Sequence, residues 1–228
     1  MGNKNLIITI EREYGSGGRI VGRKLAEELG LHFYDDEILK MASEKSAVGE
    51  EFFRLADEKA GNNLLHRLTG AKKADVFGKP SLKGDVTSPD NLFKFQAMVM
   101  RELAEQEPCV FVGRAAGYVL DQDEEIENLV RIFVYADRVR RVQRVMEVDC
   151  ISEERAKKRI RKIENERKNY YKYFTGNDWK NMKNSDQYDP PRTGRDGGAD
   201  QGICEAARVY EVGVNENNLS VMQAKNFS

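Results

Sequence analysis

The chain contains only two histidines and three cysteines in 228 residues, and each shortage excludes a class of function. Cys109, Cys150 and Cys204 lie far apart and form no Cys-x-x-Cys pair, so neither a zinc knuckle nor a disulfide framework is indicated. We expect them to be buried free thiols. His32 and His66 are too few for a histidine-rich metal centre or a histidine-based nucleophilic triad. We therefore expect no metal ligands among the site residues.

Long apolar runs and an excess of one charge are also missing. No stretch approaches the roughly 20 apolar residues needed to cross a bilayer, and Met1–Ile10 has no apolar segment of signal-peptide length. The 37 Lys and Arg and the 38 Asp and Glu nearly cancel, giving a net charge of -1 and a pI near 6.2. We expect a cytoplasmic protein with no membrane partner and no nucleic-acid partner, in which any anion site is local.

The N-terminal part of the chain has the pattern of an α/β unit. Leu6–Ile10 is short, apolar and β-branched, as a buried strand is, and it leads into the glycine cluster of residues 15–18. A helix is predicted over Arg19–Leu29, because its apolar residues share one face and Gly30 can end it. Leu31–Tyr34 is predicted to be a second strand, which ends at two carboxylates, Asp35 and Asp36.

Further strands are predicted at Cys109–Val112 and Leu129–Tyr135, so the chain is expected to form a parallel sheet wrapped by helices. Residues 37–107 are expected to be a mostly helical insertion, with an exposed loop at 70–90 and a helix from about Pro89 to Gln106 capped by Ser88. After residue 189, Pro190 and Pro191 forbid a central strand, so one strand of the sheet is expected to be missing or displaced.

Residues 151–183 are rich in Lys and Arg and end in a group of aromatic side chains. The aromatic residues are Tyr170, Tyr171, Tyr173, Phe174 and Trp179. A basic helix of this kind is a solvated face, a lid that closes over phosphates, or an RNA-binding surface. The neighbouring aromatic residues favour the lid, and the slightly acidic chain as a whole disfavours RNA. The tyrosines are expected to pack rather than to stack on a base, and Arg131 is expected to be structural.

The glycine cluster lies where a phosphate-binding loop would lie. In Tyr14–Arg19, glycines between a buried strand and a helix allow backbone N–H groups to converge on phosphate oxygens. The usual motif, G-x-x-x-x-G-K-[ST], carries a lysine and a hydroxyl that this chain lacks at that spacing. Arg12 and Arg19 are the cations that can replace the missing lysine's charge.

Together with the later sequence blocks, this loop resembles the cytidylate kinase-like family. The resemblance spans roughly residues 6–189 and rests on the blocks Ile10–Arg19, Leu25–Gly30, Phe33–Asp36, Val110–Ala115, Arg131–Ala136 and Tyr170–Gly176. It implies a kinase-type P-loop domain over residues 1–189, in which 37–107 is the substrate-side insertion and 151–183 is the lid. Residues 190–228 would be an irregular C-terminal tail.

The resemblance also implies roles for individual residues. Tyr14, Gly15, Ser16, Gly17, Gly18 and Arg19 would bind the phosphates of ATP. Asp35, Asp36 and Arg114 would bind the acceptor, and Arg19, Arg114, Arg161 and Arg167 would neutralise charge during transfer. Ala115 stands where the family has an aspartate after the arginine, so one acceptor contact is missing. The implied reaction is ATP- and Mg²⁺-dependent phosphorylation of a nucleoside monophosphate, with CMP or dCMP as the expected acceptor.

Two other functions stay open from the sequence alone. Because the lysine and the aspartate are both missing, the chain could be a nucleotide- or phosphate-binding protein with little transferase activity. The basic helix and its aromatic neighbours also leave an RNA-binding module as a third function. Assembly of identical copies is compatible with each of them.

Overall fold

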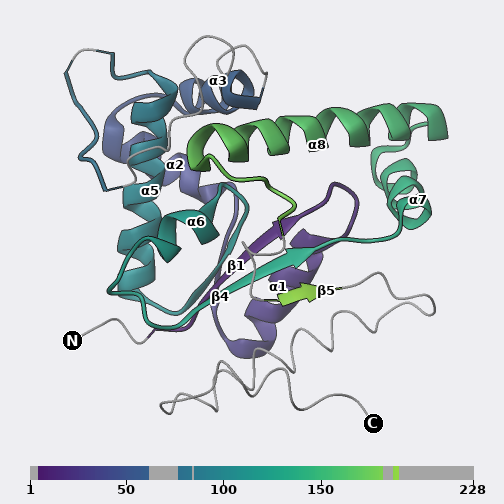
Figure 1. The fold of residues 1–228 in the computed structure, drawn as a ribbon, viewed down its shortest axis with the longest axis horizontal. Helices are drawn as coiled ribbons and strands as arrows, with labels where there is room; N and C mark the ends of the chain where they lie inside the picture. Colours follow the sequence, from purple (N-terminus) through teal and green to yellow (C-terminus); the bar gives the residue numbers. More distant parts are fainter. Residues whose placement is uncertain (1–4, 62–76, 84, 182–186, 190–228) are drawn as a thin grey trace.

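The computed structural model describes residues 5–61, 77–83, 85–181 and 187–189, which form strands alternating with helices (Figure 1). The strands are β1 (Ile7–Arg12), β2 (His32–Tyr34), β3 (Cys109–Val112), β4 (Leu129–Val134) and β5 (Gln187–Asp189). The helices are α1 (Gly18–Leu29), α2 (Glu37–Ser46), α3 (Glu50–Gly61), α5 (Pro89–Gln106), α6 (Ala116–Asp121), α7 (Arg138–Asp149) and α8 (Glu153–Thr175).

The five strands form one parallel sheet in the order β2-β3-β1-β4-β5, which confirms the predicted fold class. β1 lies in the centre, and the chain turns to one side of it for β2 and to the other side for β4. In sheets of this kind, ligands bind outside the carboxyl ends of the strands where the strand order reverses. That position here is the end of β1, beside the end of β3.

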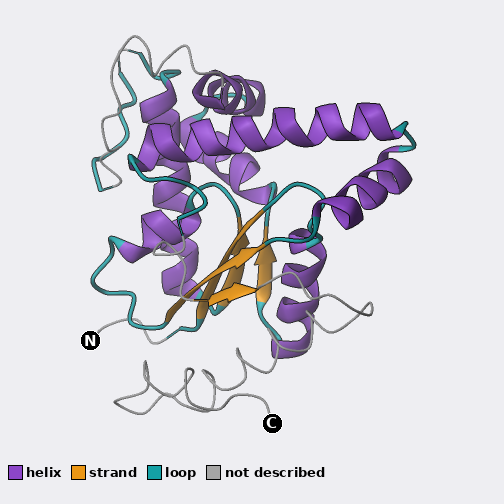
Figure 2. Cartoon of the chain, turned by 45° about the vertical axis from the view of Figure 1, so that its right-hand side comes forward, coloured by secondary structure: helices purple, strands orange, loops and turns teal. Residues whose placement is uncertain are grey.

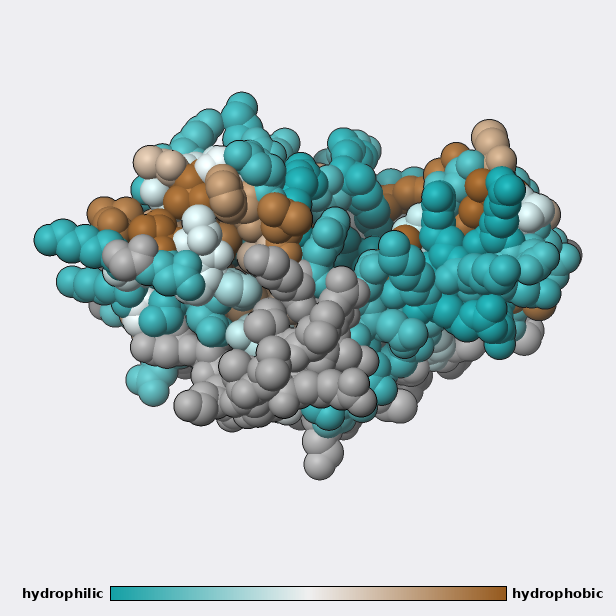
Figure 3. Space-filling model, turned by 90° about the horizontal axis from the view of Figure 1, so that it is seen from above, coloured by the Kyte–Doolittle hydropathy of each residue, from teal (hydrophilic) through white to brown (hydrophobic). Residues whose placement is uncertain are grey.

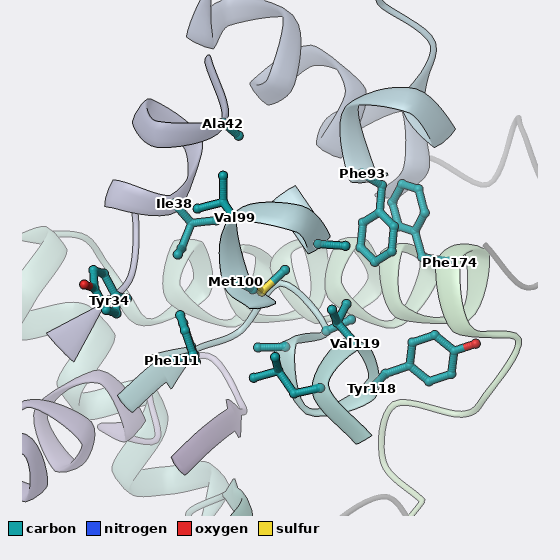
Figure 4. Packing of buried hydrophobic residues seen from close by; sticks show 14 of the residues in the cluster. Tyr34, Ile38, Ala42, Phe93, Val99, Met100, Phe111, Tyr118, Val119 and Phe174 are labelled. Atoms are coloured by element: carbon teal, nitrogen blue, oxygen red, sulfur yellow. The ribbon is translucent and has the colours of Figure 1, made fainter. Parts of the chain in front are cut away.

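Each face of the sheet has its own hydrophobic cluster, because side chains alternate along a strand. Ile8 and Ile10 of β1 pack on the side of α1, with Leu25 among their neighbours. Ile7 lies in the other cluster with Phe111 of β3. Figure 4 shows this second cluster, in which side chains of the sheet meet those of α2, α5 and α6.

The insertion is built on α5, whose bounds match the predicted helix. Ser88 occupies the N-cap position, as predicted, but its side chain makes no capping hydrogen bond. Phe93 of α5 stacks on Phe174 of α8 with their ring centroids 4.1 Å apart, so the insertion and the basic helix share one core (Figure 4).

The long helix α8 runs across the side of the sheet on which the strands end (Figures 1 and 2). It packs against α7 through a small apolar cluster of Val142, Val145, Ala156 and Ile160. Seen from the α8 side, the surface is largely hydrophilic, with hydrophobic areas toward α3 and toward α7 (Figure 3). None of the helices in the described ranges is long and apolar enough to span a membrane.

Three sequence predictions are corrected or fall outside the described ranges. A fifth strand is present at Gln187–Asp189, where it pairs with β4 and ends directly before Pro190. Cys109 is buried as expected, but Cys150 is exposed, because it is the residue that ends α7. Residues 190–228, which include Cys204, and part of the predicted loop at 70–90 lie outside the described residues.

Candidate active site

The glycine loop joins β1 to α1. Gly15 and Gly17 have φ angles of +80° and +89°, in the left-handed region that only glycine adopts without strain. Ser16 braces the turn, since its hydroxyl donates to the carbonyl of Glu13 at 2.9 Å and accepts from the N–H of Gly18 at 3.3 Å. Within the described ranges, the N–H groups of Gly15, Gly17 and Arg19 have no acceptor. The loop therefore offers free donors at a helix N-terminus, as an anion site requires.

Two arginines of α7 hold the loop by its carbonyl groups. Arg141 donates from Nε to the carbonyl of Tyr14 at 2.9 Å, and Arg144 donates to the carbonyl of Gly15 at 2.9 Å. Arg141 is buried, and its other nitrogens bond to Glu13 at 2.7 Å and to Glu164 of α8. The two arginines of α7 thus bond to carbonyl groups of the loop and to none of its N–H groups.

A cavity of about 240 Å³ opens beside the loop. Its walls come from the ends of β1, β2 and β3, from α3, from α8 and from Trp179. Three arginines line it, Arg12 from β1, Arg114 from the end of β3 and Arg167 from α8. The cavity occupies the edge of the sheet where the strand order reverses.

Arg114 is fixed by partners from the insertion. Its guanidinium donates to Asp57 of α3 at 2.6 Å and to Gln96 of α5 at 3.4 Å, and it lies 3.6 Å from Asp36. Burial is the largest single influence and lowers the pKa of Arg114, but Asp57, Tyr170 and Asp36 together outweigh it and raise the pKa above its ordinary value. Arg114 is thus permanently charged and held in one orientation. The backbone φ angles of Arg114 and of Ala115 after it both lie in the left-handed region.

Arg167 reaches from α8 to the end of β1. It donates to the carbonyl of Arg12 at 2.7 Å, and its guanidinium lies 5.6 Å from the centre of the Tyr14 ring. Burial and then the neighbouring Arg12 charge lower the pKa of Arg167 to about 9. Two like charges are therefore held close together in a partly buried cavity, an arrangement that an anion would relieve.

The structure brings some of the predicted site residues together and leaves others apart. Arg114, Arg167, Asp35 and Asp36 all line the cavity, whereas no residue of the glycine loop, Tyr14–Arg19, does; the loop follows the cavity residue Arg12 along the chain. Arg19 does not line the cavity: its side chain is 58% exposed and pairs at 2.6 Å with Asp35, which does line it.

Arg161 is exposed on α8 and does not line the cavity. The outer face of this helix carries ion pairs one turn apart, Lys157–Glu153 and Lys158–Glu154, so much of its basic charge is balanced locally. The inner face, which carries Arg167, is the one that reaches the cavity.

Several residues of the site could not be found from the sequence. Asp57 lies in an insertion helix that carries no motif, and Glu11 reads as part of a strand. Glu11 accepts from the indole N–H of Trp179 at 3.0 Å, and its other oxygen is buried without a partner among the described residues. The hydroxyl of Tyr170 is likewise buried and unpartnered there, and its ring packs on Phe174.

The remaining tyrosines of the aromatic group pack in the core, as predicted: Tyr171 and Tyr173 are buried. Arg131 forms an ion pair with Asp121 at 2.9 Å, which agrees with the structural role expected for it. Of the aromatic group, Tyr170, Tyr171 and Trp179 line the cavity, whereas Tyr173 does not.

Comparison with known proteins decides the family. The profile of the cytidylate kinase-like family matches residues 7–189, about four fifths of the chain. The chain belongs to the cytidylate kinase-like family. The match extends from β1 to the last residue of β5, so it includes the glycine loop, the insertion and α8.

Three solved structures are similar to the chain, and the first of them supports the fold. An uncharacterised protein from Eubacterium ventriosum ATCC 27560 is 22% identical with a TM-score of 0.55, covering 81% of this chain and 86% of that one. TT1252 from Thermus thermophilus is 20% identical with a TM-score of 0.44, covering 93% and 99% of the two chains. Shikimate kinase from Acinetobacter baumannii, in complex with shikimate, is 16% identical with a TM-score of 0.39, covering 94% and 97%. No curated protein matches the chain.

Proposed function

We propose that the protein transfers the γ-phosphoryl group of ATP to a nucleoside monophosphate. The observation that carries the proposal is that a loop with free N–H donors and a cavity lined by three arginines share one edge of the sheet. Phosphoryl transfer is catalysed mainly by positioning and by neutralising charge, which is what these two features supply. Membership of a kinase-like family supports the same reaction.

In this reaction, one non-bridging oxygen of the acceptor's phosphate forms a bond to the γ-phosphorus of ATP. The bond from that phosphorus to the β,γ-bridging oxygen breaks, and its electron pair leaves with ADP. The free N–H groups of the loop would hold the donor phosphates, and Arg114, fixed by Asp57, would orient the acceptor's phosphate. No general base is needed, because the attacking phosphate oxygen carries no proton to be removed.

Magnesium would enter with the nucleotide. The described residues contain no group of three or more His, Cys, Asp or Glu side chains that could hold a metal ion. Mg²⁺ is commonly bound through one or two carboxylates together with substrate phosphates, and Asp36 is an exposed carboxylate on the cavity wall that suits this role. A bound Mg²⁺ would neutralise charge on the phosphate oxygens.

We propose CMP or dCMP as the acceptor, because of the family to which the chain belongs. Ala115 stands next to Arg114 at the cavity wall and has no polar group to offer a base or a sugar. A pyrimidine specificity would then depend on other wall residues, such as Asp57, which holds the Arg114 guanidinium at 2.6 Å.

The test is incubation with ATP, Mg²⁺ and a panel of nucleoside monophosphates, with ADP formation as the readout. We expect one preferred acceptor, and we expect Arg114→Met to reduce transfer by at least about 100-fold if a charge-assisted phosphate contact of about 3 kcal/mol is lost. Arg138→Met is the matched control, since Arg138 is exposed on α7 away from the cavity.

Two outcomes would replace the proposal. Stabilisation by nucleotide without ADP formation from any acceptor would indicate a binding protein with no efficient transfer. Salt-sensitive RNA affinity that does not require ATP would indicate an RNA-binding module instead.

A further inference from the structure

We infer that Arg12 replaces the missing P-loop lysine and binds the terminal phosphate of the nucleotide donor. The inference rests on the proposed function and adds a residue to it. Three observations carry it: the path of the Arg12 side chain, the lack of a counter-charge for its guanidinium, and its position between the loop and the cavity.

Two glycines leave room for the Arg12 side chain. A Cβ atom at Gly18, the first residue of α1, would lie 2.5 Å from the Cβ of Arg12. A Cβ atom at Gly113, directly after β3, would lie 2.1 Å from Nη1 of Arg12. The stem of Arg12 therefore passes the helix N-terminus, and its guanidinium lies on the backbone at the end of β3. A side chain at either position would displace it.

The guanidinium of Arg12 has no direct counter-charge. Within the described ranges, no carboxylate oxygen lies within 4.0 Å of it and it donates no hydrogen bond, whereas Arg114 has Asp57 at 2.6 Å. Burial, opposed in part by more distant carboxylates, lowers the pKa of Arg12. An arginine held in this way is ready for a charge-assisted bond to an anion, and its removal leaves no orphaned carboxylate.

The place of Arg12 identifies which phosphate it meets. It is the last residue of β1, two residues before the loop begins at Tyr14, and it lines the cavity. The carbonyl of Arg12 accepts from Arg167, so the two arginines approach the same point from the sheet and from α8. A phosphate bound between the loop and the cavity would be the terminal one of the donor, because the inner phosphates would lie over the loop amides and the acceptor would lie beyond.

The replacement also accounts for the glycine at position 18. The first residue of α1 can carry a long side chain only if no other side chain crosses there, and the Arg12 stem crosses within contact distance. Gly18 and Arg12 therefore act together. Gly18 stands at the position of the motif's lysine, directly after Gly17, and because it has no side chain it leaves room for a cation from the preceding strand.

The experiment compares equilibrium binding of a non-hydrolysable ATP analogue and of ADP, each with Mg²⁺, using the fluorescence of Trp179. Trp179 is the only tryptophan in the chain and lines the cavity. We expect Arg12→Met to weaken binding of the analogue by about 10- to 100-fold and of ADP by less than about threefold, and Arg12→Lys to restore part of the loss. Equal losses for both nucleotides, or no loss, would overturn the inference.

Matched variants separate this role from a structural one. Gly113→Ala keeps the arginine but displaces its guanidinium, and we expect the same selective loss of analogue binding. Gly30→Ala introduces alanine at a similar positive φ, where no heavy atom lies within 4 Å of the new Cβ, so selectivity should not change. Arg23→Met removes an arginine of α1 whose guanidinium lies over the Phe33 ring and should also leave selectivity unchanged.

The result is independent of turnover. If the wild type binds nucleotide but transfers phosphate to no acceptor, the proposed function fails while the analogue-to-ADP comparison still tests Arg12. If Arg12→Met binds both nucleotides normally but loses affinity for the acceptor alone, Arg12 belongs to the acceptor site and the inference is wrong.

Discussion

Substitution of Arg141 by methionine tests how the phosphate loop is held in place. This side chain is 7% exposed and joins α7 to the start of the loop and to α8. It bonds to the Tyr14 carbonyl at 2.9 Å, to Glu13 at 2.7 Å and to Glu164 of α8. Arg141→Met keeps most of the apolar volume but leaves two carboxylates without this partner. The change thus removes an ion-pair network rather than a packing contact.

The expected cost follows from the burial of those carboxylates. Removing one partner of a buried ion pair typically costs about 3–5 kcal/mol. Glu13 keeps a bond from Lys180 and the Glu164 side chain is 20% exposed, so the lower end applies, about 3 kcal/mol. For a chain of this size, that corresponds to a fall in Tm of about 6–12 °C.

The assay is thermal and urea unfolding of the wild type, Arg141→Met and Arg138→Met. Arg138 is exposed on the same helix, so its substitution should change stability by no more than about 0.5 kcal/mol. In a Glu164→Gln background the cost of Arg141→Met should be smaller, because one of the stranded charges is gone. A loss below about 1 kcal/mol for Arg141→Met would refute the view that this network holds the loop.

Three further predictions follow from individual residues. Arg12→Met should raise the Tm of the ligand-free protein, because a lowered pKa means that the charged side chain destabilises the fold at every pH below its folded-state pKa. Calorimetry without nucleotide checks this, and an unchanged or lower Tm would contradict it. Gly15→Ala should lower Tm more than Gly30→Ala, since both have positive φ but only the Cβ at Gly15 would meet the carbonyl oxygen of Arg141, at 2.9 Å. Alkylation of the folded protein at pH 8, followed by peptide mass spectrometry, should label exposed Cys150 and spare Cys109, whose pKa burial raises to about 12. Equal labelling would show that β3 opens readily.

Much of the fold could be predicted because its signals are local. The helix at Gly18–Leu29 has an apolar face and a glycine after it, and the helix at Pro89–Gln106 begins at a proline; both were predicted within a residue. β1 extends to Arg12 although the apolar run stops at Ile10, because β4 continues to pair with it. β5 was missed because its three residues carry no apolar pattern, and only β4 defines it as a strand.

The candidate site shows the same difference between local and long-range signals. The glycine loop lies within a few residues of sequence and was predicted from spacing and from the family resemblance. Asp57 and Arg114 meet across 57 positions, and Arg141 reaches Tyr14 across 127, so neither contact leaves a trace in any short window. Arg12 was one of two candidate cations in the sequence, and only the geometry separates it from Arg19, which pairs with Asp35.

The 23 residues of α8 form one continuous helix, roughly 34 Å long at 1.5 Å per residue. Near its middle, Glu164 and Arg167 bond to Arg141 and to the end of β1, and near its C-terminal end Phe174 stacks on the insertion. Because the helix is rigid, a shift at the Arg167 contact also moves the Phe174 contact. On the proposed function, a nucleotide that draws Arg167 toward the loop would therefore also reposition the wall on the insertion side, so that binding of either substrate would favour binding of the other.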